Sequence, residues 1–406
     1  MRRADEESRC RPPTFERDLI TGEPINCQKG PSMIYLYYSD RFLNYNFGPE
    51  HPLNPTRLSL SYKLMEDSGL IDDKMEVLEP EPASEEELRL VHTLEYIEAV
   101  RLEEPDLAFG LGSDDTPVFP GIFEASRTMA GGSIDAAKRM IEEDCSAFNI
   151  AGGLHHAFPT QAAGFCVFND VALAISILKR RFSRILYLDI DAHHGDGVQQ
   201  IFYEDPNVLT FSIHESGDYL FPGTGFVDEA GYGPGLGYCV NLPMPMYASD
   251  RDFRLAFEEV VPRLFDWFRP QVVVAELGVD THYSDPLTSL NLTLRGYARM
   301  VRRIVELTGI YAEGRLLALG GGGYSLQVVP PAWTAALHLM RGEEPTEYLP
   351  PYWVELFSNV VGYVPLSYPD IDLPIGTETE KRVSLELAST MKRLKGVHAR
   401  INPELF

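Results

Sequence analysis

Short apolar runs, each followed by a segment with a helical pattern, constrain the fold of this chain most strongly. Eight such runs alternate with helical segments between residue 33 and about residue 340. Strands buried on both faces give continuous apolar runs, and parallel strands need helical crossovers between them. The sequence therefore predicts a three-layer α/β/α fold with a mainly parallel, eight-stranded sheet. The expected strands are residues 33–38, 75–78, 148–151, 208–213, 238–242 and 316–319, a run that begins at 185, and a run that ends at Asp280.

The chain length allows one or two domains. Large α/β enzymes often form a single domain, and 44% hydrophobic residues in a chain of 406 are enough for a substantial core. We expect residues 1–31, which are polar and contain prolines, to form a flexible N-terminal arm. Residues 32–406 are expected to form one domain. Its C-terminal extension, from about residue 343, should pack on the outside and include an amphipathic helix near residues 381–394.

Composition argues against several classes of protein. The chain has 35 Lys and Arg against 60 Asp and Glu, a net charge of −25, which repels phosphate backbones and favours a cationic substrate or protein partner. We expect no direct nucleic-acid binding. The sequence has no apolar run of 18 residues, and acidic residues follow Met1-Arg2-Arg3, so neither a membrane span nor export is expected. The five scattered cysteines form no Cys-X-X-Cys pair, which favours a reducing, cytoplasmic location.

Charged and imidazole side chains gather where two of the expected strands end. The run from Ile185 passes within a few residues into three carboxylates and two imidazoles, and its Asp189, Asp191 and His193 would project to one side if the segment stays extended. A second histidine pair, 155 and 156, follows another strand and a Gly-Gly turn. A lone histidine is more often structural, but these two pairs contain four of the ten histidines. Both lie where open parallel sheets bind their ligands, which favours a functional site.

Three of these side chains form a candidate metal site. Asp191, His193 and Asp280 offer two carboxylates and one imidazole, which leaves a coordination position open for water or substrate, as in catalytic metal sites. The mixed nitrogen and oxygen ligands suit Zn²⁺. The same ligands would also accept Fe²⁺, Co²⁺ or Mn²⁺.

Other residues could supply acid and base chemistry beside that metal. A neutral imidazole from His155 or His156 could take a proton from water that the metal activates, provided that a carboxylate fixes its tautomer. Asp189 and Asp196 are candidates for that orienting role. The glycine run before Tyr324 could bring a phenolic hydroxyl close to a developing oxyanion.

Six motifs occur in one order along the chain: Gly152–Ala157, Gly164–Cys166, Asp189–Gly197, Phe221–Gly225, Gly278–Thr281 and Gly320–Tyr324. Together they resemble the zinc-dependent histone deacetylase family, over about residues 33–340; any one of them alone would be weak. The segments Tyr37–Asp40 and Phe47–Pro52 are similar to the prokaryotic acetoin-utilisation branch of that family.

The resemblance implies an arginase/deacetylase fold and a role for each motif residue. Metal ligands would be Asp191, His193 and Asp280. His156 would be general base and acid, His155 its electrostatic partner, and Tyr324 the polariser of the substrate carbonyl. Asp189 would orient His155, and Asp196 would orient His156.

Further positions match substrate and cation sites of the family. Asp115 matches an aspartate at the rim that holds the substrate backbone, although a solvated turn is the favoured interpretation of its loop without the resemblance. Arg57 matches an arginine near the acetate exit. Residues matching the acyl-lysine tunnel are Gly164, Phe165, Phe221 and Gly322. A monovalent cation, K⁺ or Na⁺, is implied at two sites: Asp189, Asp191, His193 and Ser212 for the inner one, and Phe202, Asp205, Val208 and Tyr238 for the outer one.

Three functions remain open from the sequence. The leading one is hydrolysis of acetyl, or other acyl, groups from protein lysine side chains, with an acetyl-CoA-forming enzyme as a substrate that the branch resemblance suggests. Tyr324 supports hydrolysis, because family branches with histidine there are poor deacetylases. The alternatives are an acetylpolyamine or other small-molecule deacetylase, and a non-catalytic metal-binding scaffold. The segment Asp280-Thr281-His282 lacks the Asp-X-Asp pair of a two-metal ureohydrolase, which favours a single metal. Leu220, where many relatives have an aromatic residue, leaves the acyl preference open.

Overall fold

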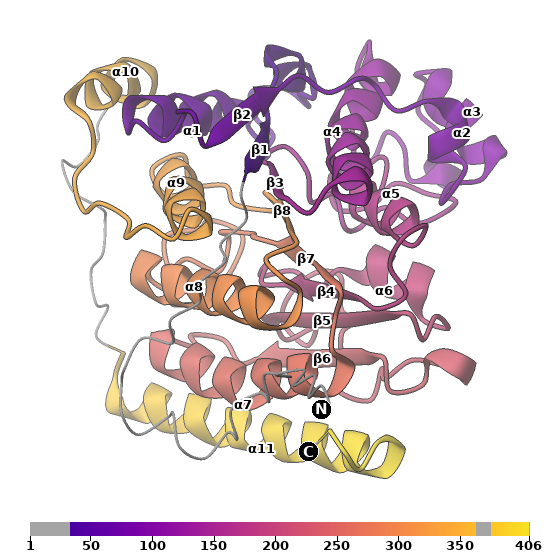
Figure 1. The fold of residues 1–406 in the computed structure, drawn as a ribbon, viewed down its shortest axis with the longest axis vertical. Coiled ribbons are helices and arrows are strands. Elements are labelled where there is room, and N and C mark those ends of the chain that lie inside the picture. The colour runs from indigo at the N-terminus through magenta and orange to yellow at the C-terminus, as the bar shows by residue number, and fades with distance from the viewer. Residues whose placement is uncertain (1–32, 363–374, 406) are drawn as a thin grey trace, which may run out of the picture.

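All eight strands of the structure, a computed structural model that describes residues 33–362 and 375–405, belong to one parallel sheet (Figure 1). Their order is β2-β1-β3-β8-β7-β4-β5-β6. This confirms the predicted fold class. The expected arm, residues 1–31, lies outside the described residues. The strands are β1 (Ile34–Tyr37), β2 (Met75–Leu78), β3 (Ser146–Asn149), β4 (Ile185–Asp189), β5 (Val208–Glu215), β6 (Cys239–Met244), β7 (Val272–Glu276) and β8 (Leu316–Leu319).

Helices form a layer on each side of the sheet (Figure 1). On one side α1, α9, α8, α7 and α11 pack in that order, each against the next. Helix α10 also lies on this side and packs on α1. On the other side α4 packs on α5, and α5 on α6. The helices are α1 (Thr56–Asp67), α2 (Glu85–Leu88), α3 (Leu94–Arg101), α4 (Ile122–Glu142), α5 (Asp170–Leu178), α6 (Asp196–Phe202), α7 (Asp250–Phe268), α8 (Leu294–Tyr311), α9 (Val329–Met340), α10 (Pro351–Val361) and α11 (Thr377–Ile401).

The strands form because their side chains are apolar and are covered from both sides. Every residue of β3, β4, β6, β7 and β8 is buried, whereas the edge strand β2 buries only Met75. The expected strand 148–151 was wrong by two residues, because Asn149 ends β3 and its Oδ1 accepts a hydrogen bond from the backbone of Ala151. The expected strand 208–213 continues to Glu215, because polar His214 and Glu215 find buried partners.

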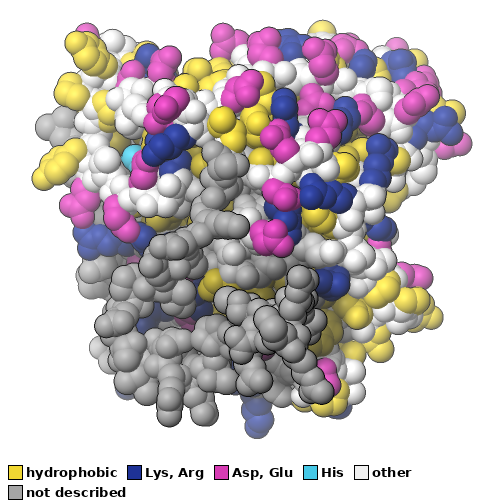
Figure 2. Space-filling view, in the orientation of Figure 1, with side chains coloured by type: hydrophobic (Ala, Val, Ile, Leu, Met, Phe, Trp, Pro, Cys, Tyr) yellow, Lys and Arg dark blue, Asp and Glu magenta, His cyan; other side chains and the backbone are white. Residues whose placement is uncertain are grey.

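On the face shown in Figure 2, described acidic and basic side chains are interspersed, and no continuous band of Lys and Arg is visible there. Among the described residues, no helix is both long and apolar enough to cross a bilayer. A cytoplasmic location stays a prediction.

The C-terminal extension packs on the body of the domain through two helices. In α10, Trp353 is fully buried against Leu60 and Leu64 of α1, and its indole Nε1 donates to the carbonyl of Leu60 at 2.9 Å. The long helix α11 contains the expected amphipathic segment and packs on β6 and α7. The extension therefore contributes to the stability of the domain.

We expect Trp353→Ala to lower the free energy of unfolding by about 3–5 kcal/mol, because it empties a buried site and removes an indole hydrogen bond. Chemical denaturation measures this change. Tyr352→Ala is the matched control, because Tyr352 is 80% exposed and should change stability by no more than about 0.5 kcal/mol. Equal stability of the two variants would contradict the proposed packing.

Candidate active site

The predicted site residues follow four neighbouring strands in the middle of the sheet. His155 and His156 come after β3, Asp191 and His193 after β4, Asp280 after β7 and Tyr324 after β8. These strands lie side by side in the order β3-β8-β7-β4. Because parallel strands end at the same edge of a sheet, the topology brings these side chains to one place.

The segment after β4 turns immediately and does not stay extended. The strand ends at Asp189, whose Oδ1 accepts a hydrogen bond from the backbone N–H of Asp191 at 3.0 Å. Asp191 in turn accepts from the N–H of His193 at 2.9 Å. The condition stated for the sequence, that the segment stays extended to His193, is therefore not met. Short aspartate side chains compete for backbone donors, and these two bonds curl the loop after β4.

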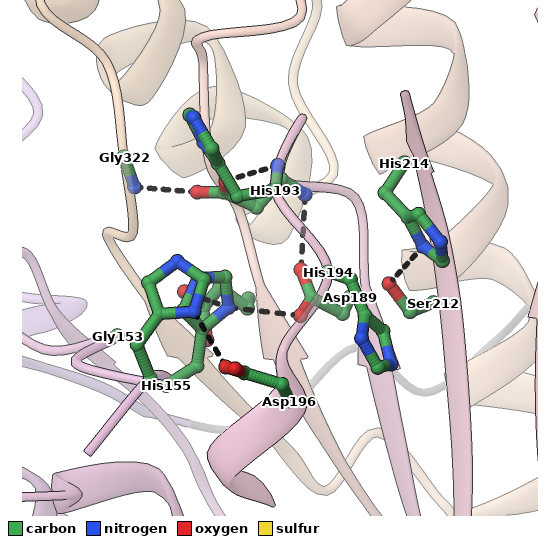
Figure 3. A network of polar contacts seen from close by, with 12 residues as sticks. Gly153, His155, Asp189, His193, His194, Asp196, Ser212, His214 and Gly322 are labelled. Atoms are coloured by element: carbon green, nitrogen blue, oxygen red, sulfur yellow. Dashed lines mark hydrogen bonds and ion pairs between the residues drawn. The ribbon is translucent and has the colours of Figure 1, made fainter. Parts of the chain in front are cut away.

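The three candidate metal ligands converge in a buried position. His193 Nδ1 lies 2.9 Å from Asp280 Oδ2 and 3.3 Å from Asp191 Oδ1, and all three ligand atoms lie within 4.8 Å of one another. A glycine at position 322 leaves room for these ligands. Any other residue would place its Cβ atom 2.3 Å from Asp280 Oδ2, which is too close. The backbone N–H of Gly322 also donates to Asp191 Oδ2 at 2.6 Å (Figure 3).

The charges of this set fit a divalent cation. Burial and the neighbouring Asp191 raise the pKa of Asp280 to about 7. Burial alone would lower the pKa of His193, but its hydrogen bonds with Asp191 and Asp280 raise that pKa to about 10. Two buried carboxylates beside one imidazole are an excess of negative charge that a bound cation would neutralise. The donor set and the charge therefore suit the predicted metal site.

The structure brings each predicted histidine–aspartate pair together. His155 Nδ1 lies 3.0 Å from Asp189 Oδ2, and His156 Nδ1 lies 2.7 Å from Asp196 Oδ1 (Figure 3). The two Nε2 atoms face each other at 3.0 Å, so one ring donates and the other accepts.

The electrostatics decide which ring of the pair donates. Burial alone would lower the pKa of His155, but Glu276 and Asp189 raise it well above 6.5. Burial, together with the charge on His155, lowers the pKa of His156 to about 4. His155 is therefore the imidazolium donor. His156 is a neutral imidazole that donates from Nδ1 to Asp196 and keeps a lone pair on Nε2.

Aromatic rings lead from the surface to His156. Phe221 is 46% exposed, and its ring centroid lies 5.1 Å from that of His156. Phe165 lies 5.8 Å from the ring of Tyr324. Gly164 adopts φ +53°, and a Cβ atom there would lie 2.2 Å from the His156 ring, so only glycine fits. The N–H of Gly164 donates to Asp115 Oδ2 at 2.7 Å, which places Asp115 next to these aromatic residues.

Arg57 fixes the backbone of the glycine run after β8 by hydrogen bonds. This buried guanidinium donates to the carbonyls of Gly321 at 2.8 Å and Gly323 at 3.1 Å. The next residue, Tyr324, places its ring centroid 6.4 Å from that of His193. Burial, and then the charges of Asp280 and Asp191, raise the pKa of Tyr324 well above 10, so its hydroxyl stays a donor.

The positions predicted for monovalent cations lie in two places in and around β4, α6 and β5, and just before β6. At the inner one, Ser212 is the direct cross-strand partner of Asp189, and its hydroxyl contacts His214 Nδ1 at 2.7 Å. At the outer one, the carboxylate of Asp205 pairs with Lys179. Phe202 closes α6, Val208 begins β5, and the Tyr238 carbonyl accepts from Thr210 at 2.9 Å. Cation binding at both places stays a prediction.

Sequence reasoning missed several buried polar residues that support the site. Asp170 accepts hydrogen bonds from the backbone of Gly153 and Leu154, the turn that leads to the histidine pair. Glu276 and Tyr187 lie behind His155 and Asp189. The signal that could have revealed Glu276 is a carboxylate at the end of an otherwise apolar, buried strand, because such a group needs a partner.

Comparisons with known proteins agree with this geometry. A family model described as the histone deacetylase domain matches residues 51–340. The acetoin utilization protein AcuC of Bacillus subtilis (strain 168) is 43% identical over 327 residues, covering 78% of this chain and 84% of the relative. The protein of the same name from Staphylococcus aureus (strain MRSA252) is 36% identical over 333 residues, covering 79% and 85%.

Two solved structures have the same fold. A crystal structure of an HDAC homolog complexed with SAHA superimposes with a TM-score of 0.77 at 32% identity, over 87% of this chain and 99% of that one. The structure of an HDAC homolog from Aquifex aeolicus gives 0.76 at 32% identity, over the same shares. These likenesses confirm the expected arginase/deacetylase fold. The chain therefore belongs to the histone deacetylase family of hydrolases, in its acetoin utilization branch.

Proposed function

We propose that this deacetylase uses one Zn²⁺ ion to remove acetyl groups from lysine side chains of proteins. The observation that carries the proposal is the position of His156. Its Nδ1 is held by Asp196 at 2.7 Å, its ring centroid lies 6.0 Å from that of the candidate ligand His193, and Phe221 lies over it from the surface side. A neutral base thus adjoins the candidate metal ligands, with a partly exposed aromatic ring on its surface side. Scaffold function alone would not need this arrangement.

The residues of the site divide the reaction between them. A divalent ion held by Asp191, His193 and Asp280 would supply a Lewis acid for the amide carbonyl and lower the pKa of a water. His156 takes the proton of the attacking water at Nε2, once that water replaces the His155 N–H as the partner of this atom, and later gives the proton to the leaving lysine amine. His155, positively charged, and the hydroxyl of Tyr324 stabilise the negative charge that develops on the carbonyl oxygen. Acetate and free lysine result, and Arg57 lies behind the site, where acetate would leave.

Protein lysine is favoured over a small molecule by the rim of the passage. Asp115 accepts the N–H of Gly164 and is only half-buried, so its carboxylate is partly accessible next to Gly164 and Phe165. Such a group can accept backbone N–H groups of a peptide. An acetyl-CoA-forming enzyme is the protein partner we propose from the family branch, and an acetylpolyamine is the alternative substrate.

Turnover of an acetyl-lysine peptide and of an acetylpolyamine by the same preparation separates the two substrates. We expect the higher kcat/KM for the peptide. Asp115→Asn should lower this preference by raising KM for the peptide, because uniform binding is lost without loss of chemistry. A higher kcat/KM for the polyamine would support the alternative.

Tyr324→Phe should lower kcat by a factor on the order of 10²–10³, because it removes one preorganised donor to the developing oxyanion. Steady-state acetate release measures this. Tyr348→Phe is the control, since Tyr348 is 77% exposed. An unchanged rate for Tyr324→Phe would refute the role assigned to its hydroxyl.

Removal of the metal should abolish activity and lower thermal stability, because Asp191 and Asp280 would then repel each other in a buried position. Titration of chelator-treated protein with Zn²⁺ should show one equivalent bound per chain. Asp280→Asn should weaken that binding by a factor of about 10 or more, since it removes a charged ligand. Fe²⁺, Co²⁺ and Mn²⁺ serve as comparisons. If none of these four ions bound, the assigned ligand set would be contradicted.

A further inference from the structure

Behind the histidine pair lies a carboxyl group that the proposed reaction does not use. Glu276 is the last residue of β7, is fully buried, and stands beside Asp189 in the register of β7 and β4. Its Oε1 lies 3.0 Å from His155 Nδ1, and its Oε2 lies 2.9 Å from the hydroxyl of Tyr187. Two carboxyl groups therefore surround a single imidazole nitrogen and a single phenol.

The number of hydrogens in this cluster is too small if both carboxyl groups are ionised. The Tyr187 hydroxyl lies 2.6 Å from Asp189 Oδ2 and 2.9 Å from Glu276 Oε2. A phenol has one hydrogen, so it can donate to only one of them. The other contact needs a hydrogen that a carboxyl group supplies.

That hydrogen belongs on Glu276. Asp189 already accepts at both oxygens, from the Asp191 backbone at Oδ1 and from His155 at Oδ2. Glu276 Oε1, by contrast, receives no hydrogen bond: the His155 N–H is aimed at Asp189 although Oε1 is equally near. A buried, ionised carboxylate with an unpartnered oxygen would be costly, and a neutral acid is less so.

We propose that Glu276 is a positioning residue that acts as a neutral carboxylic acid. Its Oε2–H donates to Tyr187, and the Tyr187 hydroxyl donates to Asp189. Asp189 thus remains an ionised acceptor for His155 Nδ1, and with Glu276 neutral it is the carboxylate that keeps His155 positively charged and aimed at His156. This inference rests on the proposed function, because it explains how the electrostatic partner of the base is held.

Two further observations support it. Burial raises the pKa of Glu276 well above 4.5; the charge of His155 opposes this shift, and the charge of Asp189 adds to it. The carboxyl also lies between the turns that carry the catalytic groups. A Cβ atom at Gly153 would lie 3.1 Å from Oε1, and one at Gly321 would lie 3.0 Å from Cγ. Glu276 therefore contacts both the turn before His155 and the turn before Tyr324.

One competing interpretation is a second cation. His155, Asp191 and Glu276 each place a possible ligand atom within 4.8 Å of the others. Such a cation would need the Nδ1 lone pair of His155, but the structure directs that nitrogen at Asp189 at 3.0 Å. The hydrogen-bonded arrangement is therefore preferred, and the experiment separates the two.

Glu276→Gln and Glu276→Leu test the proposal with the zinc-loaded full chain. Glutamine is the isostere of the neutral acid, because its NH₂ can donate to Tyr187 and its carbonyl replaces Oε1. We expect Glu276→Gln to keep kcat within a few-fold of the wild type. Glu276→Leu, and Tyr187→Phe, should lower kcat by about 10–100-fold with little change in KM, as losses of orienting partners do. Glu76→Gln, the same exchange at an exposed position of β2, is the control.

Infrared difference spectra of wild type against Glu276→Gln give a readout that does not depend on turnover. We expect the C=O stretching band of a protonated carboxyl group, shifted in D₂O, in the wild type alone. Absence of this band, or a kcat as low in Glu276→Gln as in Glu276→Leu, would overturn the neutral acid. If the wild type bound two divalent ions per chain and Glu276→Gln bound only one, the neutral-acid proposal would be overturned in favour of a second cation site. If the wild type released no acetate, the proposed function would fail while the band still reported on Glu276.

Discussion

Burial of negative charge at one edge of the sheet is the constraint on which the site depends. Asp189, Asp191, Glu276 and Asp280 are all fully or nearly fully buried there. Unpaired, each would carry a large desolvation penalty, so the fold must provide compensation. It does so with His155 and His193, with backbone N–H groups, with the proton proposed for Glu276, and with a position suited to a cation.

Backbone geometry makes this concentration of charge possible. The loop after β4 is curled by Asp189 and Asp191, which accept the N–H groups two residues further along. Glycine provides the remaining room, since a Cβ atom at Gly278 would lie 2.1 Å from Asp191 Oδ2. The parallel sheet places strand ends from distant parts of the sequence next to one another, and α10 and α11 pack outside it on α1, and on β6 and α7.

The sequence was informative about features that depend on residues close together along the chain. Continuous apolar runs predicted all eight strands, and polar residues directly after them predicted the histidine pairs, Asp191 and Asp280, because strand ends are exposed to ligands. The strand order is set by packing between distant segments and was not predictable from these runs. Boundaries were missed where a side chain such as Asn149 ends a strand by capping the next turn. Glu276 was missed because its partners, Tyr187 and His155, are far away in sequence.

Anomalous diffraction at the zinc absorption edge, from crystals of the zinc-loaded protein, tests the central claim most directly. The account predicts one strong peak, within coordination distance of Asp191 Oδ, His193 Nδ1 and Asp280 Oδ, on the side of the site that His156 and Tyr324 face. No peak among these three side chains, or a zinc ion bound elsewhere with the carboxylates left paired to His193 alone, would contradict it.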